Sequence, residues 1–299
     1  MYLLFKSTIL YGSYLVFPFI AFLWYVMQKF KHELWLKAIL FASLFPSFLF
    51  VYIRFVEPQL ITVNRTRIDV GFKAKVILIS DLHLGMYKHE NYLRRVVSKT
   101  NSICDSKDCD AVLIAGDLTH WPKKDELVKL FTPLKSLKIP VYTVLGNHDV
   151  GRPGPEIRSE LEEALQANNV KLLNNEAIKL KEYYILGLGD MWNHESDVRM
   201  LEQFKSTENV IVLAHHPEVI HFYSGLGGKN ADITLSGHCH GGQLKIPYIY
   251  KLFLPCEPPF EKGLYDIKGQ RVFVSSGLGE TGFPIRLRVP PVVEVLELY

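Results

Sequence analysis

Length, composition and charge already limit what this chain can be. It has 299 residues, enough for one large domain or two ordinary ones. Lysine and arginine number 34 against 31 acidic residues, and a net charge of +3 is too small to favour a nucleic-acid partner. Hydrophobic residues make up 48% of the chain, and their distribution along it indicates both membrane segments and a soluble core.

The N-terminal part contains two long apolar runs. Residues 7–28 include no charged side chain, and residues 34–53 include only Lys37. Roughly 20 apolar residues in a helix cross the hydrocarbon core of a bilayer. A cleaved signal peptide is the alternative, but the first run is long for one and no small-residue cleavage site follows it. We therefore expect two transmembrane helices in residues 1–56 and a soluble domain in residues 57–299.

Basic residues lie on both sides of this expected hairpin. The loop side carries Lys29, Lys31 and Lys37, while the domain side carries a larger set: Arg54, Arg65, Arg67, Lys73 and Lys75. Two spans place the N-terminus and the soluble domain on the same face of the membrane. Because positive residues favour the cytoplasm, the larger set favours a multi-pass protein of the bacterial inner membrane with a cytoplasmic domain.

From residue 75 onward, short apolar runs alternate with amphipathic stretches. The runs predict buried strands at 75–80, 111–115, 141–145, 210–214 and 232–236. The stretches between them predict helices at about 89–103, 123–136, 155–168 and 196–206. This alternation is typical of a layered α/β domain. Three more strand-like runs, at 179–187, 271–275 and 292–298, lack intervening helices and indicate a mixed or second sheet.

The four cysteines do not have the spacing of a zinc ribbon. A disulfide between Cys104 and Cys109 fits an exported domain, but four thiols in a domain of this size do not make a disulfide framework. Cys239 stands between two histidines, and its side chain is expected to point away from them as a small filler.

Polar residues follow each of the five predicted buried strands. The five blocks are Asp81-Leu-His83, Gly116-Asp117, Gly146-Asn147-His148-Asp149, His215-His216-Pro217 and Gly237-His238-Cys-His240. Any one of them has an ordinary explanation, such as a helix cap, a turn or a surface histidine. In α/β sheets, however, ligands bind where the carboxyl ends of the strands converge. Five such blocks, each after an apolar strand, therefore predict one site.

The residue types in these blocks select metal chemistry. Imidazole, carboxylate and amide groups with no required thiolate suit manganese, iron, zinc or cobalt, and argue against a structural cysteine-rich zinc site. The candidate ligands are too many for one ion with open positions, but they suit two ions that share a carboxylate. Such a pair, ~3.5–4 Å apart, acts on the attacking and leaving oxygens of a phosphoryl displacement. No His-Glu-x-x-His helix occurs, so metal-dependent proteolysis has little support.

The five blocks, in this order, resemble the calcineurin-like metallophosphoesterase superfamily over about residues 75–280. The variants Ser-Asp-Leu-His-Leu-Gly (80–85) and Gly-His-Cys-His-Gly-Gly-Gln (237–243) are similar to a bacterial membrane-associated branch. That branch includes YaeI-like and YkuE-like phosphodiesterases and the UDP-2,3-diacylglucosamine pyrophosphatases of the LpxG type. The resemblance implies a four-layer αββα sandwich, phosphoesterase activity and two divalent metal ions, with manganese as the first candidate.

The resemblance also implies a role for each polar residue. The first ion would be held by Asp81, His83, Asp117 and His240, and the second by the shared Asp117 with Asn147, His215 and His238. His215 is preferred to His216 because the ligand of this family directly follows the strand. His148 would bind the phosphate or protonate the leaving oxygen, and Asp149 would orient His148 and tune its pKa.

Substrate-binding residues are expected near the last block. The backbone N–H groups of Gly241, Gly242 and Gln243 are candidates for phosphate contacts. Arg152 is a candidate partner for a second phosphate, with a solvated loop charge as the alternative. His120 receives no role. The apolar segment 246–255 is either an acyl-chain or membrane contact, or a buried strand or helix.

Together these features favour a membrane-anchored phosphoesterase with a lipid-linked phosphate substrate. The most specific expectation is hydrolysis of UDP-2,3-diacylglucosamine to UMP and 2,3-diacylglucosamine 1-phosphate in lipid A biosynthesis. One alternative is a periplasmic or cell-wall phosphodiesterase. Another is a non-catalytic metal-binding membrane protein, against which stands the presence of both His148 and Asp149.

Overall fold

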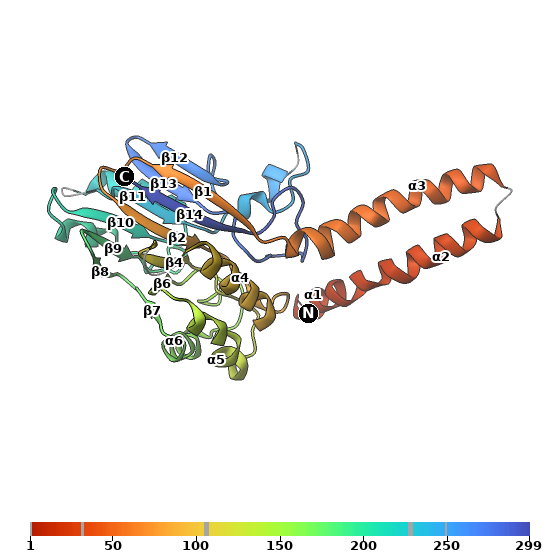
Figure 1. Cartoon of the computed structure of the whole chain (residues 1–299), viewed down its shortest axis with the longest axis horizontal. Helices are drawn as coiled ribbons and strands as arrows, with labels where there is room; N and C mark the ends of the chain where they lie inside the picture. The colour runs from red at the N-terminus through yellow and green to blue at the C-terminus, as the bar shows by residue number, and fades with distance from the viewer. Residues whose placement is uncertain (1, 31–32, 105–107, 227–229, 249) are drawn as a thin grey trace.

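The computed structural model places a helical hairpin beside an α/β body (Figure 1). The structure describes residues 2–30, 33–104, 108–226, 230–248 and 250–299. Lys31, part of the expected loop charge, and Ile249, part of the apolar segment 246–255, lie outside these ranges.

The hairpin consists of two long, mostly exposed apolar helices. The first is built from α1 (Tyr2–Gly12), a 3-10 turn (Ser13–Leu15) and α2 (Val16–Lys29), and the second begins with α3 (Leu34–Val51). By length and composition, the 27-residue span Leu3–Lys29 and the 26-residue span Leu34–Gln59 are each able to cross a membrane. Large apolar side chains such as Trp24, Phe41 and Phe45 remain exposed on the hairpin. An apolar surface of this extent marks a membrane or protein contact.

The second helix enters the body without a flexible linker. A π-helical turn (Tyr52–Val56) and a 3-10 turn (Glu57–Gln59) lead directly to strand β1. The Ile53 carbonyl accepts a hydrogen bond from Arg286 N at 2.9 Å, and the Glu57 carboxylate accepts one from Val289 N at 2.7 Å. These contacts fix the base of the hairpin to a loop that follows the second sheet.

Two six-stranded sheets form the body. The first has the order β1 (Thr62–Ile68), β14 (Val292–Leu298), β2 (Ala74–Ile79), β4 (Ala111–Ala115), β6 (Val141–Val144) and β7 (Val170–Leu172). The second has the order β12 (Gly263–Ile267), β13 (Gln270–Val274), β11 (Ile233–Ser236), β10 (Asn209–Leu213), β9 (Tyr183–Gly187) and β8 (Glu176–Leu180). A short third pair joins β3 (Leu84–Gly85) to β5 (Thr119–His120).

The central strands are short and strongly apolar because helices or the other sheet cover both of their faces. Between the sheets, Val76 and Leu113 of the first pack in one cluster with Ile211 and Phe273 of the second. A separate core lies on the outer face of the first sheet, under α4 (Glu90–Ile103), α5 (Leu127–Leu130) and α6 (Arg158–Ala167). A third core lies beneath the 3-10 helices Val198–Gln203 and Pro217–Gly225. The four-layer α/β sandwich expected from the blocks is confirmed.

Several elements differ from the sequence expectation. The helix predicted at 123–136 is a series of short turns around α5, and the one at 196–206 is a 3-10 helix. The run at 179–187 forms parts of two antiparallel strands, β8 and β9. Strands β1 and β12 were not expected, because each mixes polar with apolar residues and is only partly buried.

The cysteines form two pairs, Cys104 with Cys109 and Cys239 with Cys256, whose Cα atoms lie 5.6 and 5.3 Å apart. Both separations suit a disulfide. The interpretation of Cys239 as a simple filler is therefore wrong: it is cross-linked to the end of the apolar segment beside the site. The expectation that the four thiols do not make a disulfide framework is also wrong, because all four are paired.

Candidate metal centre

The site lies where strands of both sheets end. β2, β4 and β6 deliver Asp81, Asp117 and Asn147, and β10 and β11 deliver the histidines of the last two blocks. Five of the seven expected ligands have left-handed backbone conformations, with φ of 51° at Asp81, 45° at His83, 50° at Asp117, 68° at His238 and 50° at His240. Such conformations are uncommon outside glycine and concentrate at functional sites. The sharp turns they produce aim these side chains inward from the strand ends.

A first group of ligand atoms gathers around one point. His83 Nε2 lies 3.0 Å from His240 Nε2 and 3.4 Å from Asp117 Oδ2. His240 Nε2 lies 3.5 Å from Asp81 Oδ1. All four side chains are buried, and together they form one of the chain's groups able to hold a cation.

A second group shares Asp117 with the first. His215 Nε2 lies 3.3 Å from Asp117 Oδ2, 3.1 Å from Asn147 Oδ1 and 3.2 Å from His238 Nδ1. The other ring nitrogen of His215 lies 2.8 Å from the Ala115 carbonyl, and a proton donated there leaves Nε2 free as a ligand atom. Asp117 Oδ1 is held by the N–H of His148 at 2.9 Å, so only Oδ2 faces both groups.

These separations fit two metal ions. Ligand atoms at 2.0–2.2 Å from an ion lie about 3.0–3.5 Å from one another in tetrahedral or octahedral geometry. The distances between ligand atoms in the two groups, 3.0–3.5 Å, are of that length. The donor set and its spacing therefore fit a dinuclear centre that shares the Asp117 carboxylate.

The electrostatics of the cluster agree with this fit. Burial lowers the pKa of His83 and His240 well below the usual value and that of His238 to about 3, so their rings are neutral and have lone pairs to offer. Burial also acts to lower the pKa of His215, but the Asp117 carboxylate outweighs it and raises the pKa to about 10. The raised pKa shows that Asp117 favours a positive charge at His215 Nε2, and a metal ion bound there would supply that charge in place of the proton.

The close approach of the loops depends on glycine at Gly237. A Cβ atom at this position would lie 2.7 Å from Asp81 Oδ2 and 2.7 Å from Ser80 Cβ. Any larger residue would push the two ligand-bearing loops apart, so the glycine that precedes His238 is a packing requirement of the site.

His148 lies at the edge of the two ligand groups. Its Nε2 is 3.3 Å from the hydroxyl of Thr281, and its ring centroid is 4.8 Å from that of His83. Burial is the largest of the influences that lower the pKa of His148. The ring lines the same cavity as Asp117 and Asn147, where a group that contacts substrate is needed.

Asp149 acts differently from the expectation. Its carboxylate accepts hydrogen bonds from the N–H groups of Leu118, Thr119 and Gly146 and from the Thr119 hydroxyl, at 2.8–3.0 Å. Among the described hydrogen bonds, none joins Asp149 to His148. Asp149 therefore joins the loops after β4 and β6, and it positions His148 through the backbone rather than through the ring.

A cavity of about 440 Å³ opens from the ligand groups. One wall is polar and includes Asp117, Asn147, His148, His238 and His240. The rest of the lining is mostly apolar and includes Leu244, Pro255, Phe283 and Ile285. The cavity therefore suits an amphiphilic molecule with its phosphate at the metal centre.

The expected substrate contacts are only partly met. The N–H groups of Gly242 and Gln243 bond to the carbonyls of Cys239 and His240, which corrects the expectation that both face a phosphate. The Gln243 amide contacts the backbone of Thr281 and Phe283 at 3.0 Å, so it holds the loop beside His148 instead. Gly241 adopts φ of 57°, and a Cβ there would press on Ser276.

Arg152 is exposed and lines a second, open cavity of about 640 Å³ together with Trp192 and Phe222. Its backbone carbonyl accepts a hydrogen bond from Asn147 Nδ2, and its N–H donates to the Asn147 carbonyl at 2.7 Å. The first of these contacts turns Asn147 Oδ1 toward His215. Arg152 thus orients a metal ligand through its main chain, whatever its side chain binds.

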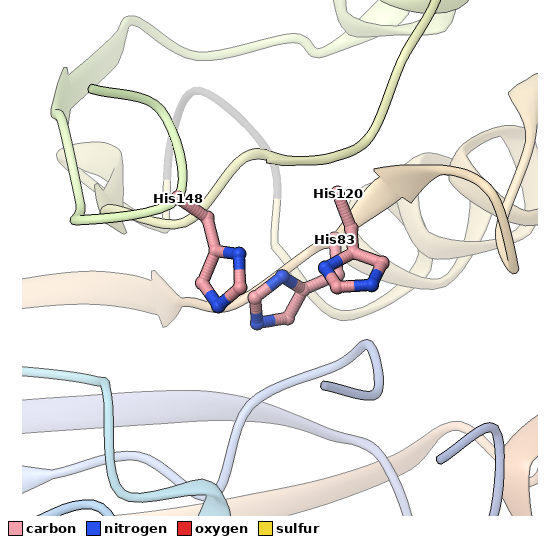
Figure 2. A group of neighbouring side chains, drawn as sticks. All are labelled: His83, His120 and His148. Carbon is pink, nitrogen blue, oxygen red and sulfur yellow. The ribbon is translucent and has the colours of Figure 1, made fainter. Parts of the chain in front are cut away.

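Three further side chains, to which the sequence analysis gave no role, lie near the site. The buried ring of His120 lies 5.1 Å from that of His148 and 5.5 Å from that of His83, and Figure 2 shows the three rings gathered together. His216 contacts Asp190, with 3.4 Å between Nδ1 and Oδ2, beside the second group. Trp192 packs edge-on against His238 at 4.7 Å. His216 directly follows His215, which was preferred to it as a ligand, and His120 stands three residues after Asp117, whereas no motif in the sequence pointed to Trp192.

Comparison with known proteins gives the class. The family model for the calcineurin-like phosphoesterases matches residues 74–242, which is more than half of the chain and contains every one of the seven expected ligands. The chain belongs to this family of metal-dependent phosphoesterases.

Three individual relatives share 24–30% of their aligned residues with this chain. An uncharacterized metallophosphoesterase of Campylobacter jejuni is 30% identical over 233 residues, covering 75% of this chain and 59% of its own length. The phosphodiesterase YaeI of Escherichia coli is 25% identical, covering 86% of this chain and 95% of its own. The UDP-2,3-diacylglucosamine pyrophosphatase LpxG of Chlamydia muridarum is 24% identical, covering 78% and 88%. This chain thus spans about 59% of the length of the Campylobacter relative and of two from Helicobacter pylori.

Proposed function

We propose that this chain is a membrane-anchored phosphoesterase that hydrolyses a phosphodiester or pyrophosphate bond in a lipid-linked substrate. The observation that carries the proposal is a single cavity lined both by residues of the ligand cluster and by a set of apolar side chains, the apolar wall. A water-soluble phosphate ester would need no such wall, whereas an acyl-bearing one would bury its chains against it.

The seven expected residues supply the ligands in this proposal. His83, His240 and Asp81 would hold one ion, and His215, His238 and Asn147 the other, with Asp117 Oδ2 between them. Two bound divalent ions, with manganese as the first candidate, would supply Lewis-acid stabilisation of the phosphate and lower the pKa of an attacking water.

His148 would act on the leaving group. In its protonated form it would donate a proton to the leaving oxygen, and in either form it would bond to a phosphate oxygen. Thr281 accompanies it at 3.3 Å, and the Gln243 amide fixes the position of Thr281. Asp149 and Gly146 fix the main chain before and after His148.

The hairpin supports a membrane location for the substrate. Its two apolar helices have the length of membrane spans, and its base is joined to the body by hydrogen bonds rather than by a linker. Leu244, Phe283 and Ile285 follow or flank the segments that contact this base, so the apolar wall and the hairpin occupy one region of the chain's surface. A lipid would reach the cavity without leaving the membrane interface.

Our specific proposal is UDP-2,3-diacylglucosamine, cleaved to UMP and 2,3-diacylglucosamine 1-phosphate. It is supported by the similarity to the Chlamydia muridarum pyrophosphatase and by the amphiphilic cavity. The test is UMP release by the purified, manganese-loaded full-length chain, with Asp117→Asn as the variant that loses the shared ligand. A water-soluble UDP-sugar without acyl chains serves as the matched substrate.

Release of UMP from the acylated substrate, but not from the UDP-sugar without acyl chains, supports both the reaction and the role of the apolar wall. Hydrolysis of a simple aryl phosphodiester without UMP release would keep the phosphoesterase and reject the lipid A substrate. Full activity of Asp117→Asn would reject the metal centre itself.

A second candidate is a phosphodiesterase outside the cytoplasm, and the two cysteine pairs favour it. Disulfides persist in oxidising compartments and are rare in the cytosol. For the test, cells are lysed directly into a denaturing buffer that contains an alkylating reagent, and the alkylated cysteines of the protein are counted by mass spectrometry. Four alkylated cysteines would place the domain in a reducing compartment and support the UDP-linked substrate, whereas four protected cysteines would support the second candidate.

A further inference from the structure

The first helix of the hairpin carries one charged side chain between Tyr2 and Gln28, and that side chain reaches the site. Lys6 is 4% exposed, and its Nζ lies 2.9 Å from His120 Nε2. Among residues 3–13, only Lys6 and Ser13 are buried. They are seven residues apart, so they lie two turns apart on one face of the helix, and this face is turned to the body.

The position of this face is fixed by a second contact. The guanidinium of Arg54, at the base of the other helix, donates from Nε to Ser13 Oγ at 3.1 Å. Arg54 belongs to the turn whose Ile53 carbonyl is bonded to Arg286 of the body. Lys6 is thus placed by the fold of the hairpin and is not a mobile terminal side chain.

The contact between Lys6 and His120 defines the chemistry at this point. An ammonium group can only donate, so His120 Nε2 must be the acceptor and the His120 ring must be neutral with its proton on Nδ1. His120 Nδ1 is buried and has no hydrogen-bond partner among the described residues. The pair therefore offers a positive charge and a second N–H donor beside the rings of His83 and His148 (Figure 2).

A lone lysine in an apolar helix is costly, and such residues usually serve a function. The span Leu3–Lys29 has 27 residues, which corresponds to a helix about 40 Å long. The hydrocarbon core is about 30 Å thick. The first turns, including Lys6, can therefore lie at the level of lipid phosphates.

From these observations we propose that Lys6 and His120 form a second anion subsite, which binds a phosphate oxyanion next to the phosphate held at the metal centre. The inference rests on the proposed phosphoesterase function and deepens it. In a pyrophosphate substrate, the occupant would be the phosphate that is not attacked. The hairpin would then be part of the binding site as well as an anchor.

The experiment compares two soluble inhibitors of aryl phosphodiester hydrolysis by the manganese-loaded full-length protein in detergent. Uridine monophosphate has one phosphate, and uridine diphosphate has a second one that can reach the subsite. The variants are Lys6→Met, which keeps the side-chain length, and Lys6→Arg, which keeps the charge. Lys37→Met is the matched control, because it removes a lysine from the other helix near the opposite end of the hairpin.

The measured quantity is the ratio of the two inhibition constants at fixed free manganese. A hydrogen bond to a charged group contributes about 1.5–3 kcal/mol, so Lys6→Met should weaken the diphosphate by roughly 10–100-fold relative to the monophosphate. Lys6→Arg should retain most of the difference, and Lys37→Met all of it. An unchanged ratio in Lys6→Met, with the fold confirmed by thermal unfolding, would overturn the proposal.

A second arm separates the two sources of the phosphate. In nanodiscs, diester hydrolysis is measured with phosphatidylcholine alone and with phosphatidic acid added. If added phosphatidic acid competes with the diphosphate in wild type but not in Lys6→Met, a bilayer lipid also occupies the subsite. If it has no effect while the ratio changes, the occupant is the substrate's own phosphate. Because neither arm uses the acylated sugar nucleotide, failure of that substrate leaves both readouts intact.

Discussion

Asp149 provides a sharp test of how the site is held together. Its two carboxylate oxygens accept four hydrogen bonds, two from Thr119, one from Leu118 and one from Gly146, at 2.8–3.0 Å. In Asp149→Asn one oxygen becomes an NH₂ group. With the NH₂ group at the Oδ1 position, the Thr119 hydroxyl can turn to accept from it, but the Thr119 N–H faces another donor and loses its hydrogen bond. The other three hydrogen bonds lose their ionic partner, without a change in volume.

The expected loss follows from that count. Loss of one hydrogen bond to a buried charged group costs about 1.5–3 kcal/mol, and replacing the ionic partner of three others by a neutral one costs about 1 kcal/mol each, so the free energy of unfolding should fall by roughly 4–6 kcal/mol. For a body of this size, 1 kcal/mol shifts the melting temperature by about 2–4 °C, so the variant should melt on the order of 10 °C lower. Turnover should also fall, because the loops that carry Asp117 and His148 are no longer joined.

The assay is thermal unfolding of the full-length protein in detergent, with and without manganese. Thr119→Val is the matched control, since it removes one of the four donors and should produce a smaller shift. A variant Asp149→Asn that melts like wild type but turns over substrate slowly would refute this reasoning. It would return Asp149 to the role expected from the sequence, in which it acts on the His148 ring.

Two other predictions concern turnover and stability. His148→Ala should retain two manganese ions per chain by elemental analysis while turnover falls by ~10²–10⁴-fold; full activity would show that His148 neither binds the phosphate nor protonates the leaving oxygen. Burial raises the pKa of Glu294 in β14 to about 7, so its stabilising contribution is complete below the unfolded pKa and is lost as pH rises through 7. Glu294→Gln should therefore be more stable than wild type at pH 8, by about 3 kcal/mol, and show no such gain at pH 4; an equal difference at both pH values would contradict it.

The sequence predicted those residues of the site that directly follow an apolar strand in the chain. Each apolar strand and the polar block that follows it are adjacent in the chain, so the convergence of Asp81, Asp117 and His215 follows from the α/β pattern alone. The contact of Lys6 with His120 joins residues 114 positions apart. A single lysine in an apolar run has no periodicity that could reveal its partner.

In the fold too, some elements could be predicted from the sequence and others could not. The central strands are apolar runs and were predicted, whereas β1 reads Thr-Val-Asn-Arg-Thr-Arg-Ile and lies at the edge of its sheet with much of its surface exposed. An edge strand needs few apolar residues, so its sequence resembles a loop. The role of Asp149 was also out of reach, because a carboxylate after a strand can bond to a neighbouring ring or to nearby N–H groups, and only the loop geometry decides.

The position of β14 determines when this enzyme can become active during its synthesis. β14 lies between β1 and β2, pairing with β1 in parallel and with β2 in antiparallel orientation, although it is the last strand in the chain order. Before residues 292–298 have been synthesised, β1 has no neighbour and β2 has an open edge. The loop after β2 carries Asp81 and His83, so these ligands gain their final support only when residues 292–298 arrive. Metal capture is therefore expected only after residues 292–298 have been synthesised and have paired with β1 and β2, and a nascent chain without them would remain inactive.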